Sequence, residues 1–373
     1  MLLAFIDPGI LTGWSVIGVI AVTLVLSWLT THFIEEPLRR APLTSRRDVS
    51  RVLVASTVAM ALVAGPAIVE WRTEVSAAQA AITRAAELAA QQERCFGAGA
   101  GVDPESCATV SPEALVPAPE FARDDRNDAY LDDCISTTSE PDLSTCQYGV
   151  ADAPFRVAMV GDSHAVNWFP AFQRLAEERN WSLTTHFKSA CPESAAFKRN
   201  SVAEAETSCA EWNRQMATGE HIIEPYDLVV VSYSAASDSY DSPEIAIDGF
   251  LGAWQKYIDG GSTIVVMADN ARNTPEVVEC LVANADDPLA CSVPLEVAYP
   301  GTDNMIAAAQ RIPENAVVVT TEDVFCEGDR CDAVIGGVVV YRDSHHLTNT
   351  FATTLAPIIG ERLDAALAAL PAR

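Results

Sequence analysis

Hydrophobic residues are gathered into blocks along this chain, and the two longest blocks lie near the N-terminus. Residues 14–31 (WSVIGVIAVTLVLSWLTT) and 52–69 (VLVASTVAMALVAGPAIV) carry no charge over 18 residues each, close to the length that a helix needs to cross a membrane. We therefore predict two transmembrane helices, over about 14–34 and 52–70. Two buried core helices are the alternative, although water-soluble helices of this length normally keep a polar face.

The loop between the two blocks is rich in arginine, which indicates its side of the membrane. Five arginines lie in this short connection, namely Arg39, Arg40, Arg46, Arg47 and Arg51. Short loops rich in Lys and Arg stay in the cytoplasm, so both ends of the chain are expected outside. The pattern predicts a two-pass protein of the cell membrane whose remaining residues are extracytoplasmic.

The composition changes twice after the second block. Residues 72–95 are rich in Ala, Glu, Gln and Arg, which predicts a helical stalk. Residues 97–150 mix Gly, Pro, Asp, Ser and Cys, which is typical of an irregular segment. We interpret residues 72–151 as an extracytoplasmic helical stalk followed by a disulfide-rich linker, and we expect little regular structure over 97–150.

From residue 154 onward, short apolar runs alternate with longer amphipathic stretches. The apolar runs lie at 155–160, 227–232, 262–268 and 315–320, and helical patterns lie at about 165–179, 244–258 and 349–370. Continuous Val and Ile runs favour strands that are covered on both faces. Residues 152–373 are therefore predicted to form an α/β domain with a doubly wound parallel sheet, in which ligands bind at the carboxyl ends of the strands.

Charge excludes one class of partner. The chain has 51 acidic and 24 basic residues, a formal net charge of −27. Such a surface repels phosphate backbones, so we expect no nucleic acid.

All ten cysteines follow the second apolar block, and they fall into near neighbours in the sequence. An even number of cysteines outside a membrane predicts disulfides. The sequence does not fix their connectivity, and local pairing is our interpretation. Zinc is the alternative, but no CxxC or paired-His spacing accompanies these cysteines, so we predict no metal site.

The tetrapeptide GDSH, residues 161–164, follows the first predicted strand and opens the following helix. A serine at this turn lies at the carboxyl edge of the sheet, where the free N–H groups and the dipole of the helix favour an oxyanion. Ser163 is therefore a candidate nucleophile. The alternative is that Asp162 or Ser163 only caps the helix.

A second motif near the C-terminus favours the nucleophile. In YRDSHHLTNTFA, Asp343 and His346 are three residues apart just before the last predicted helix. A serine hydroxyl needs a general base, and the base needs a carboxylate that fixes its tautomer. We prefer His346 as the base and Asp343 as its partner; His345 could be the base instead, or a surface residue.

These motifs together resemble a known family. GDSH after the first strand, the stretch Lys188-Ser189-x-Cys191-Pro192, a cysteine after a strand at Cys280 and D-x-x-H-L before the last helix are similar to the SGNH domain fused to membrane acyltransferases of family 3. HFIEEPLRR, residues 32–40, resembles the end of the last helix of that family's membrane domain. The resemblance implies a three-layer α/β/α, flavodoxin-like domain over 152–373, with residues 1–71 as the end of an acyltransferase membrane domain.

The resemblance also implies a function. It implies an O-acyltransferase, with acetyl as the expected group, that modifies a hydroxyl of a cell-envelope glycan through an acyl-serine intermediate on Ser163. No cofactor is expected to bind directly, because acyl-CoA is the ultimate donor to the complete enzyme. The remaining membrane helices, in the same or a separate chain, are the expected partner, and this chain resembles the C-terminal part of a larger enzyme.

The oxyanion hole is less well marked. The family supplies a Gly and an Asn, whereas the stretch after the second apolar run reads VSYSAAS, and Asn270 in MADNARN is the candidate Asn. The backbone N–H of Ser163 is the other candidate donor. Two alternative functions stay open at this point, a carbohydrate acetyl-esterase and a non-catalytic glycan-binding domain tethered to the membrane.

Overall fold

The computed structural model describes residues 95–104, 106–107, 115–237 and 239–371, with isolated residues between 24 and 76. The chain divides into two compact units, 1–77 and 78–373, and the fold described below belongs to the second. The two predicted transmembrane helices and the stalk lie outside the described residues, apart from isolated positions. Among the described residues, none of the helices has the length and apolar character that a membrane crossing needs.

The centre of the second unit is a seven-stranded sheet with the order β1-β4-β3-β5-β6-β8, in which β2 pairs with β4. All neighbours run parallel except β2 and β4. The strands are β1 Ile135–Ser136, β2 Cys146–Gly149, β3 Phe155–Gly161, β4 Trp181–Lys188, β5 Leu228–Ser232, β6 Thr263–Met267 and β8 Ala316–Val319. The predicted parallel sheet is thus confirmed.

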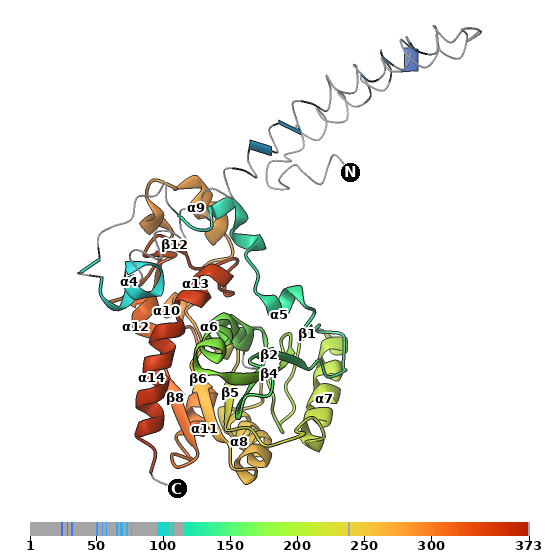
Figure 1. Cartoon of the computed structure of the whole chain (residues 1–373), viewed down its shortest axis with the longest axis vertical. Coiled ribbons are helices and arrows are strands. Elements are labelled where there is room, and N and C mark those ends of the chain that lie inside the picture. Colours follow the sequence, from blue (N-terminus) through green and yellow to red (C-terminus); the bar gives the residue numbers. More distant parts are fainter. Residues whose placement is uncertain are drawn as a thin grey trace. The chain divides into compact units, whose positions relative to one another are not determined.

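Helices cover both faces of this sheet (Figure 1). On one face, α6 (Ser163–Arg179) and α14 (Ala356–Ala368) pack on residues such as Val157 and Met159 of β3. On the other, α7 (Ala203–Thr218), α8 (Pro243–Asp259) and α11 (Asn304–Ala309) pack on Ala158 and Val160. Successive side chains of a strand point to opposite faces, so an uninterrupted apolar strand supplies both cores. The result is a three-layer α/β/α domain.

All four apolar runs that were predicted as strands are strands. The predicted helices over 165–179 and 244–258 correspond to α6 and α8. The predicted terminal helix is divided at Leu355 into α13 (Asn349–Thr354) and α14. Pro357 lies in the first turn of α14, where its missing N–H is tolerated, whereas inside one continuous helix it would break a hydrogen bond. The sequence did not indicate β4 or α7.

Two short strands of the main sheet come from the segment interpreted as a linker. β1 pairs with β4 at Ile135↔Phe187, and β2 pairs with β4 over four residues, so the sheet extends N-terminal of residue 152. The rest of that segment holds α4 Ala98–Val102, η5 Pro119–Asp124 and α5 Asp128–Leu131. The described part of the unit also contains the helices η6 Ala235–Ser237, α9 Val277–Ala283, η7 Pro288–Cys291, α10 Leu295–Ala298 and α12 Glu322–Phe325. One small sheet consists of β7 Val293–Pro294, β10 Arg330–Cys331 and β9 Cys326–Glu327, and another consists of β11 Val334–Ile335 and β12 Val338–Val339.

Five disulfides cross-link this unit, and no cysteine is free. They join the near neighbours in sequence: Cys95–Cys107, Cys134–Cys146, Cys191–Cys209, Cys280–Cys291 and Cys326–Cys331. Local pairing is therefore confirmed.

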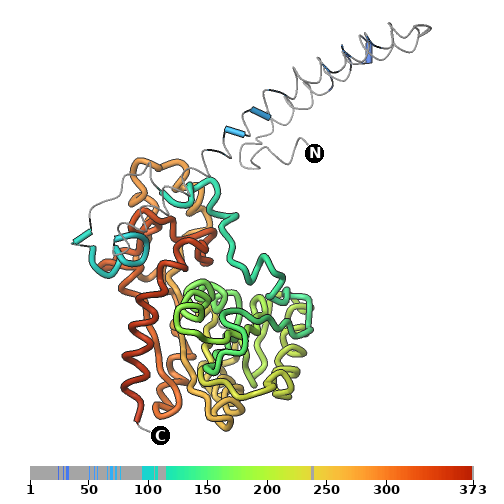
Figure 2. Tube along the Cα trace, viewed as in Figure 1, coloured from blue at the N-terminus to red at the C-terminus, as the bar shows by residue number. Residues whose placement is uncertain are grey.

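Segments far apart in the sequence lie side by side in this unit. Ala98 N, near the start of the described part of this unit, donates to Thr354 Oγ1 of α13 at 2.9 Å, and the cyan and red segments meet there in Figure 2.

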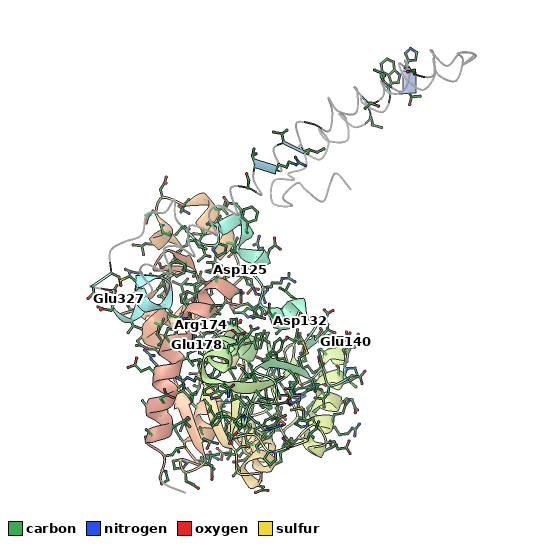
Figure 3. The ribbon with its side chains drawn as sticks, in the orientation of Figure 1. Asp125, Asp132, Glu140, Arg174, Glu178 and Glu327 are labelled. Atoms are coloured by element: carbon green, nitrogen blue, oxygen red, sulfur yellow. A yellow bond between two sulfur atoms is a disulfide. The ribbon has the colours of Figure 1, made fainter. Side chains whose placement is uncertain are left out.

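The solvent side of α6 carries the i,i+4 pair Arg174 and Glu178, which Figure 3 labels; Arg174 Nε donates to Glu178 Oε1 at 2.7 Å. The buried side of α6 faces the sheet and carries the site described next.

Candidate active site

The turn between β3 and α6 requires glycine at its first position. Gly161 has φ +153°, and a Cβ there would lie 2.2 Å from Ser232 O and 2.8 Å from Ala165 Cβ. Both distances are far below a normal contact, so no side chain fits. The close approach brings the first turn of α6 to the end of β5.

Asp162 caps α6 and anchors the turn to the neighbouring strand. Its Oδ1 accepts from His164 N at 2.8 Å, and its Oδ2 accepts from Ser234 N at 3.1 Å. The cap is therefore Asp162, and Ser163 is the first residue of the helix. Because the first N–H groups of a helix lack partners within it and the helix dipole is positive there, the turn can stabilise an oxyanion. The hydroxyl of Ser163, which is partly exposed, has no capping role.

Asp343 and His346 form a hydrogen-bonded pair in the loop after β12. His346 Nδ1 lies 2.8 Å from Asp343 Oδ2 and 3.0 Å from Oδ1, and the same Oδ1 accepts from the backbone N–H groups of His345 and His346 at 3.0 and 2.9 Å. Burial alone would raise the pKa of Asp343, but His346 and these N–H groups hold that pKa well below its usual range. Burial lowers the pKa of His346 despite the carboxylate. A neutral imidazole with an ionised carboxylate on Nδ1 is the state that a general base needs.

The other nitrogen of His346 has no hydrogen-bond partner. His346 Nε2 is buried and unpaired, and Ser163 makes no side-chain hydrogen bond within the described part of the chain. The structure brings the two segments together, because the ring centroids of His164 and His346 are 5.8 Å apart. A direct contact between Ser163 and His346 stays a prediction, and such contacts often tighten only when substrate binds.

A second carboxylate and imidazole pair lies beside the first. His164, fully buried, bonds through Nδ1 to Asp269 and through Nε2 to His345 Nδ1 at 2.9 Å. Burial acts to lower the pKa of His164, but the Asp269 carboxylate outweighs burial and raises it. Burial and the neighbouring histidines lower the pKa of His345 to about 3. His345 is therefore not a free surface residue.

Asp269 was missed by sequence reasoning. It follows β6 at the carboxyl edge of the sheet, and its Oδ2 accepts from Ala235 N at 2.8 Å while its Oδ1 accepts from Asn270 N at 2.9 Å. The signal that could have found it is its position, since a carboxylate directly after a buried strand at the ligand-binding edge is a functional candidate.

Asn270, the candidate oxyanion donor, holds the loop that carries His345. Its Nδ2 donates to Ala271 O at 2.8 Å and to His345 O at 3.0 Å, and its Oδ1 accepts from Asn167 Nδ2 at 2.7 Å. Asn167 Oδ1 also accepts from Leu347 N at 3.2 Å. An amide has two N–H donors, and both are used here. A role for Asn270 in an oxyanion hole stays a prediction, whereas its positioning of this loop is visible.

A cavity of about 210 Å³ is lined in part by Asp269. Arg272, Tyr299 and Asp303 are among its lining residues. Burial and the nearby Asp269 raise the pKa of Asp303 to about 7. The lining combines charged side chains of both signs with apolar residues such as Ala298 and Ile306.

A family model described as "SGNH domain (fused to AT3 domains)" matches residues 132–361. Among solved structures, the chain is similar to the periplasmic domain of a lipopolysaccharide acetyltransferase from Salmonella ser. Paratyphi A, with 14% identity, a TM-score of 0.43, and coverage of 57% of this chain and 85% of that chain. No curated protein matches.

Proposed function

This chain belongs to the family of SGNH domains fused to AT3 domains, and from that premise we propose that it is an O-acyltransferase that passes an acyl group, acetyl above all, to a hydroxyl of a cell-envelope glycan. Ser163 is the proposed acyl carrier, His346 the general base and Asp343 the group that orients it. The backbone N–H of Ser163 is the proposed oxyanion donor.

The observation that carries this proposal is the Asp343–His346 pair beside the GDSH turn. The carboxylate occupies Nδ1 and leaves the lone pair of the buried, unpaired Nε2 available for a proton. A purely glycan-binding domain would gain nothing from a buried imidazole without a partner, because burying an unsatisfied polar atom costs about 1–3 kcal/mol.

The proposed reaction has two halves. Ser163 Oγ attacks the carbonyl carbon of an activated acyl ester or thioester while His346 Nε2 takes the hydroxyl proton, and that proton then leaves with the departing alcohol or thiol as the acyl-serine forms. A glycan hydroxyl next attacks the acyl-serine, His346 takes its proton, and the collapse of the tetrahedral intermediate returns the proton to Ser163 Oγ. Asp343 stabilises the imidazolium in both halves.

The proposed setting is extracytoplasmic and membrane-bound. Five disulfides support an oxidising compartment. The two apolar blocks would hold the chain in the membrane, and further acyltransferase helices would bring acyl groups from cytoplasmic acyl-CoA.

A carbohydrate acetyl-esterase is the second candidate. Ser163 is partly exposed, so water can approach an acyl-serine there as well as a sugar hydroxyl can. The two reactions share the first half and differ only in the acceptor.

Acyl trapping tests the proposal. The full chain is incubated with p-nitrophenyl acetate, quenched in acid and digested, and the peptides are analysed by mass spectrometry. The acetyl group is expected on Ser163, and Ser163→Ala should carry none and lose about 10³-fold or more of the esterase rate.

Ser242 provides the matched control for this experiment. It is another serine at a helix N-terminus, where its Oγ caps α8 by accepting from Ile245 N at 3.3 Å. Ser242→Ala should keep both the label and the rate. Full activity in Ser163→Ala would end the enzyme proposal.

A further inference from the structure

Three imidazole rings from two distant segments converge beside Ser163. One ring-nitrogen atom of each of His164, His345 and His346 lies within 4.8 Å of the other two. His164 Nε2 and His345 Nδ1 form a hydrogen bond of 2.9 Å. Imidazole is the commonest ligand of transition metals in proteins.

Carboxylates hold the far nitrogens of two of these rings. Asp269 bonds His164 Nδ1, and Asp343 lies 2.8 Å from His346 Nδ1. A metal-ligating histidine nearly always gives its other N–H to such a group, which fixes the ring and makes the ligating nitrogen more basic. In each pair the carboxylate occupies Nδ1 and leaves Nε2 as the nitrogen that can bind a metal.

One ring nitrogen of the cluster has no hydrogen-bond partner. His346 Nε2 is buried without a partner, and a cation would pair it. His345 can offer its Nδ1 lone pair by moving its proton from Nδ1 to Nε2, a change of tautomer that requires no net loss of protons.

The charges around the cluster favour a cation. Asp162, Asp269 and Asp343 each accept a hydrogen bond from one of the three histidines. The opposing charges are Arg272, which acts on His164 and His345, and Arg342, which acts on His346. Three neutral nitrogen ligands suit Zn²⁺ and its neighbours rather than Mg²⁺ or Ca²⁺, which prefer oxygen. Three ligands also leave a tetrahedral ion one open position.

We propose that His164, His345 and His346 bind a divalent transition metal of the zinc class, and that its occupancy reversibly inhibits acyl transfer. The inhibitory part rests on the proposed function, because the metal would use the same Nε2 lone pair of His346 that accepts the proton of Ser163. The binding part depends only on the three rings and their carboxylates.

Metal binding is measured first, without any activity readout. The full chain, freed of metal, is titrated with Zn²⁺ in competition with a chromogenic chelator, and one ion per chain is expected. His345→Ala should weaken binding at least 100-fold, and Asp269→Asn about 10–100-fold, the usual effect of losing a carboxylate behind a ligating histidine. Melting temperatures establish that each variant is folded.

Two variants serve as controls for binding. His221→Gln removes a histidine whose Nε2 lies 3.2 Å from Tyr257 Oη, outside the cluster, and should bind Zn²⁺ like the wild type. Ser163→Ala should also bind normally because the serine is not a ligand. Absence of a one-to-one complex in the wild type, or unchanged binding in His345→Ala, would overturn the proposal.

Inhibition is measured second, on the acetyl-ester reaction. Zn²⁺ at ten times its dissociation constant should lower the wild-type rate about tenfold, since roughly a tenth of the sites stay free, and a chelator should restore it. The same concentration should leave His345→Ala at its own metal-free rate. A rate that rises with Zn²⁺ would refute inhibition. If Ser163→Ala proves fully active while Zn²⁺ still binds, the proposed function fails and the metal site stands.

Discussion

Replacing Asp343 by asparagine tests the proposed base through its tautomer. In the wild type, Asp343 Oδ2 lies 2.8 Å from His346 Nδ1, and Asp343 Oδ1 accepts hydrogen bonds from two backbone N–H groups. In Asp343→Asn the amide oxygen can keep the backbone N–H groups, which leaves the NH₂ facing His346 Nδ1. Two donors cannot face each other, so Nδ1 becomes the acceptor and the ring proton moves to Nε2. His346 can then no longer take the proton of Ser163.

The size of the loss follows from that change. A ring held in the wrong tautomer, without a carboxylate to stabilise the imidazolium, costs about 10²–10⁴-fold in rate, or about 3–5 kcal/mol in the barrier. The stability cost should be much smaller. One charge-assisted hydrogen bond is lost, and the side chain of Asp343 is 39% exposed, so we expect about 1 kcal/mol.

The assay is kcat/KM for acetyl-ester hydrolysis, with urea unfolding of the same samples. Asp227→Asn is the matched control: Asp227 also accepts a backbone N–H, from Arg156 at 2.7 Å, but it precedes β5 and so lies at the opposite edge of the sheet. It should stay within about twofold of wild type. A loss below tenfold in Asp343→Asn, with stability intact, would refute the role given to this carboxylate.

Three further predictions concern the turn, the base and a buried histidine. Gly161→Ala should lower the free energy of unfolding by about 3 kcal/mol or more in urea titrations, because its Cβ would lie 2.2 Å from Ser232 O; wild-type stability would contradict this. His346→Gln should lose about 10³-fold in kcat, and His345→Gln about tenfold at most; the reverse order would mean that His345 is the base. Burial, then the charges of His221 and Lys256, lower the pKa of His186 to about 3, so the folded state binds fewer protons than the unfolded state below pH 6.5 and loses up to about 1.4 kcal/mol per pH unit as the pH falls toward 3. His186→Gln should remove the contribution of His186 and make the slope shallower, while His221 and His345, whose pKa values are also lowered, keep part of it; an unchanged slope would show that His186 contributes nothing to it.

The strands that could be predicted are those that need only local information. β3, β5, β6 and β8 are continuous apolar runs, and burial on both faces follows directly from that pattern. β4 (WSLTTHFK) is equally buried yet contains Thr, His and Lys. Lys188 Nζ donates to Thr137 O, Glu140 O and Ser208 Oγ at 2.8, 2.6 and 2.9 Å. Its burial depends on partners that only the folded chain brings together, so no local pattern could reveal this strand.

The two carboxylate and imidazole pairs differ in the same way: local sequence predicted one pair, and the other depends on residues that are far apart in the chain. Asp343 and His346 are three residues apart, so a single turn of chain brings them together, and their spacing was readable. Asp269 and His164 are 105 residues apart, and their contact requires the strand order β3-β5-β6. A carboxylate after β6 has no visible connection to a histidine after β3 until that order is known.

The residues that follow β5 contribute to the site through backbone N–H groups, which every residue except proline has. The stretch VSYSAAS, residues 231–237, begins at the end of this strand and contains no glycine. In the structure, however, Ser234 N donates to Asp162 Oδ2 at 3.1 Å and Ala235 N donates to Asp269 Oδ2 at 2.8 Å. Two successive backbone N–H groups thus fix the carboxylate that caps the helix of Ser163 and the carboxylate that holds His164. Because residue types do not reveal which backbone N–H groups bond to a carboxylate, the support of this site could be found only from the structure.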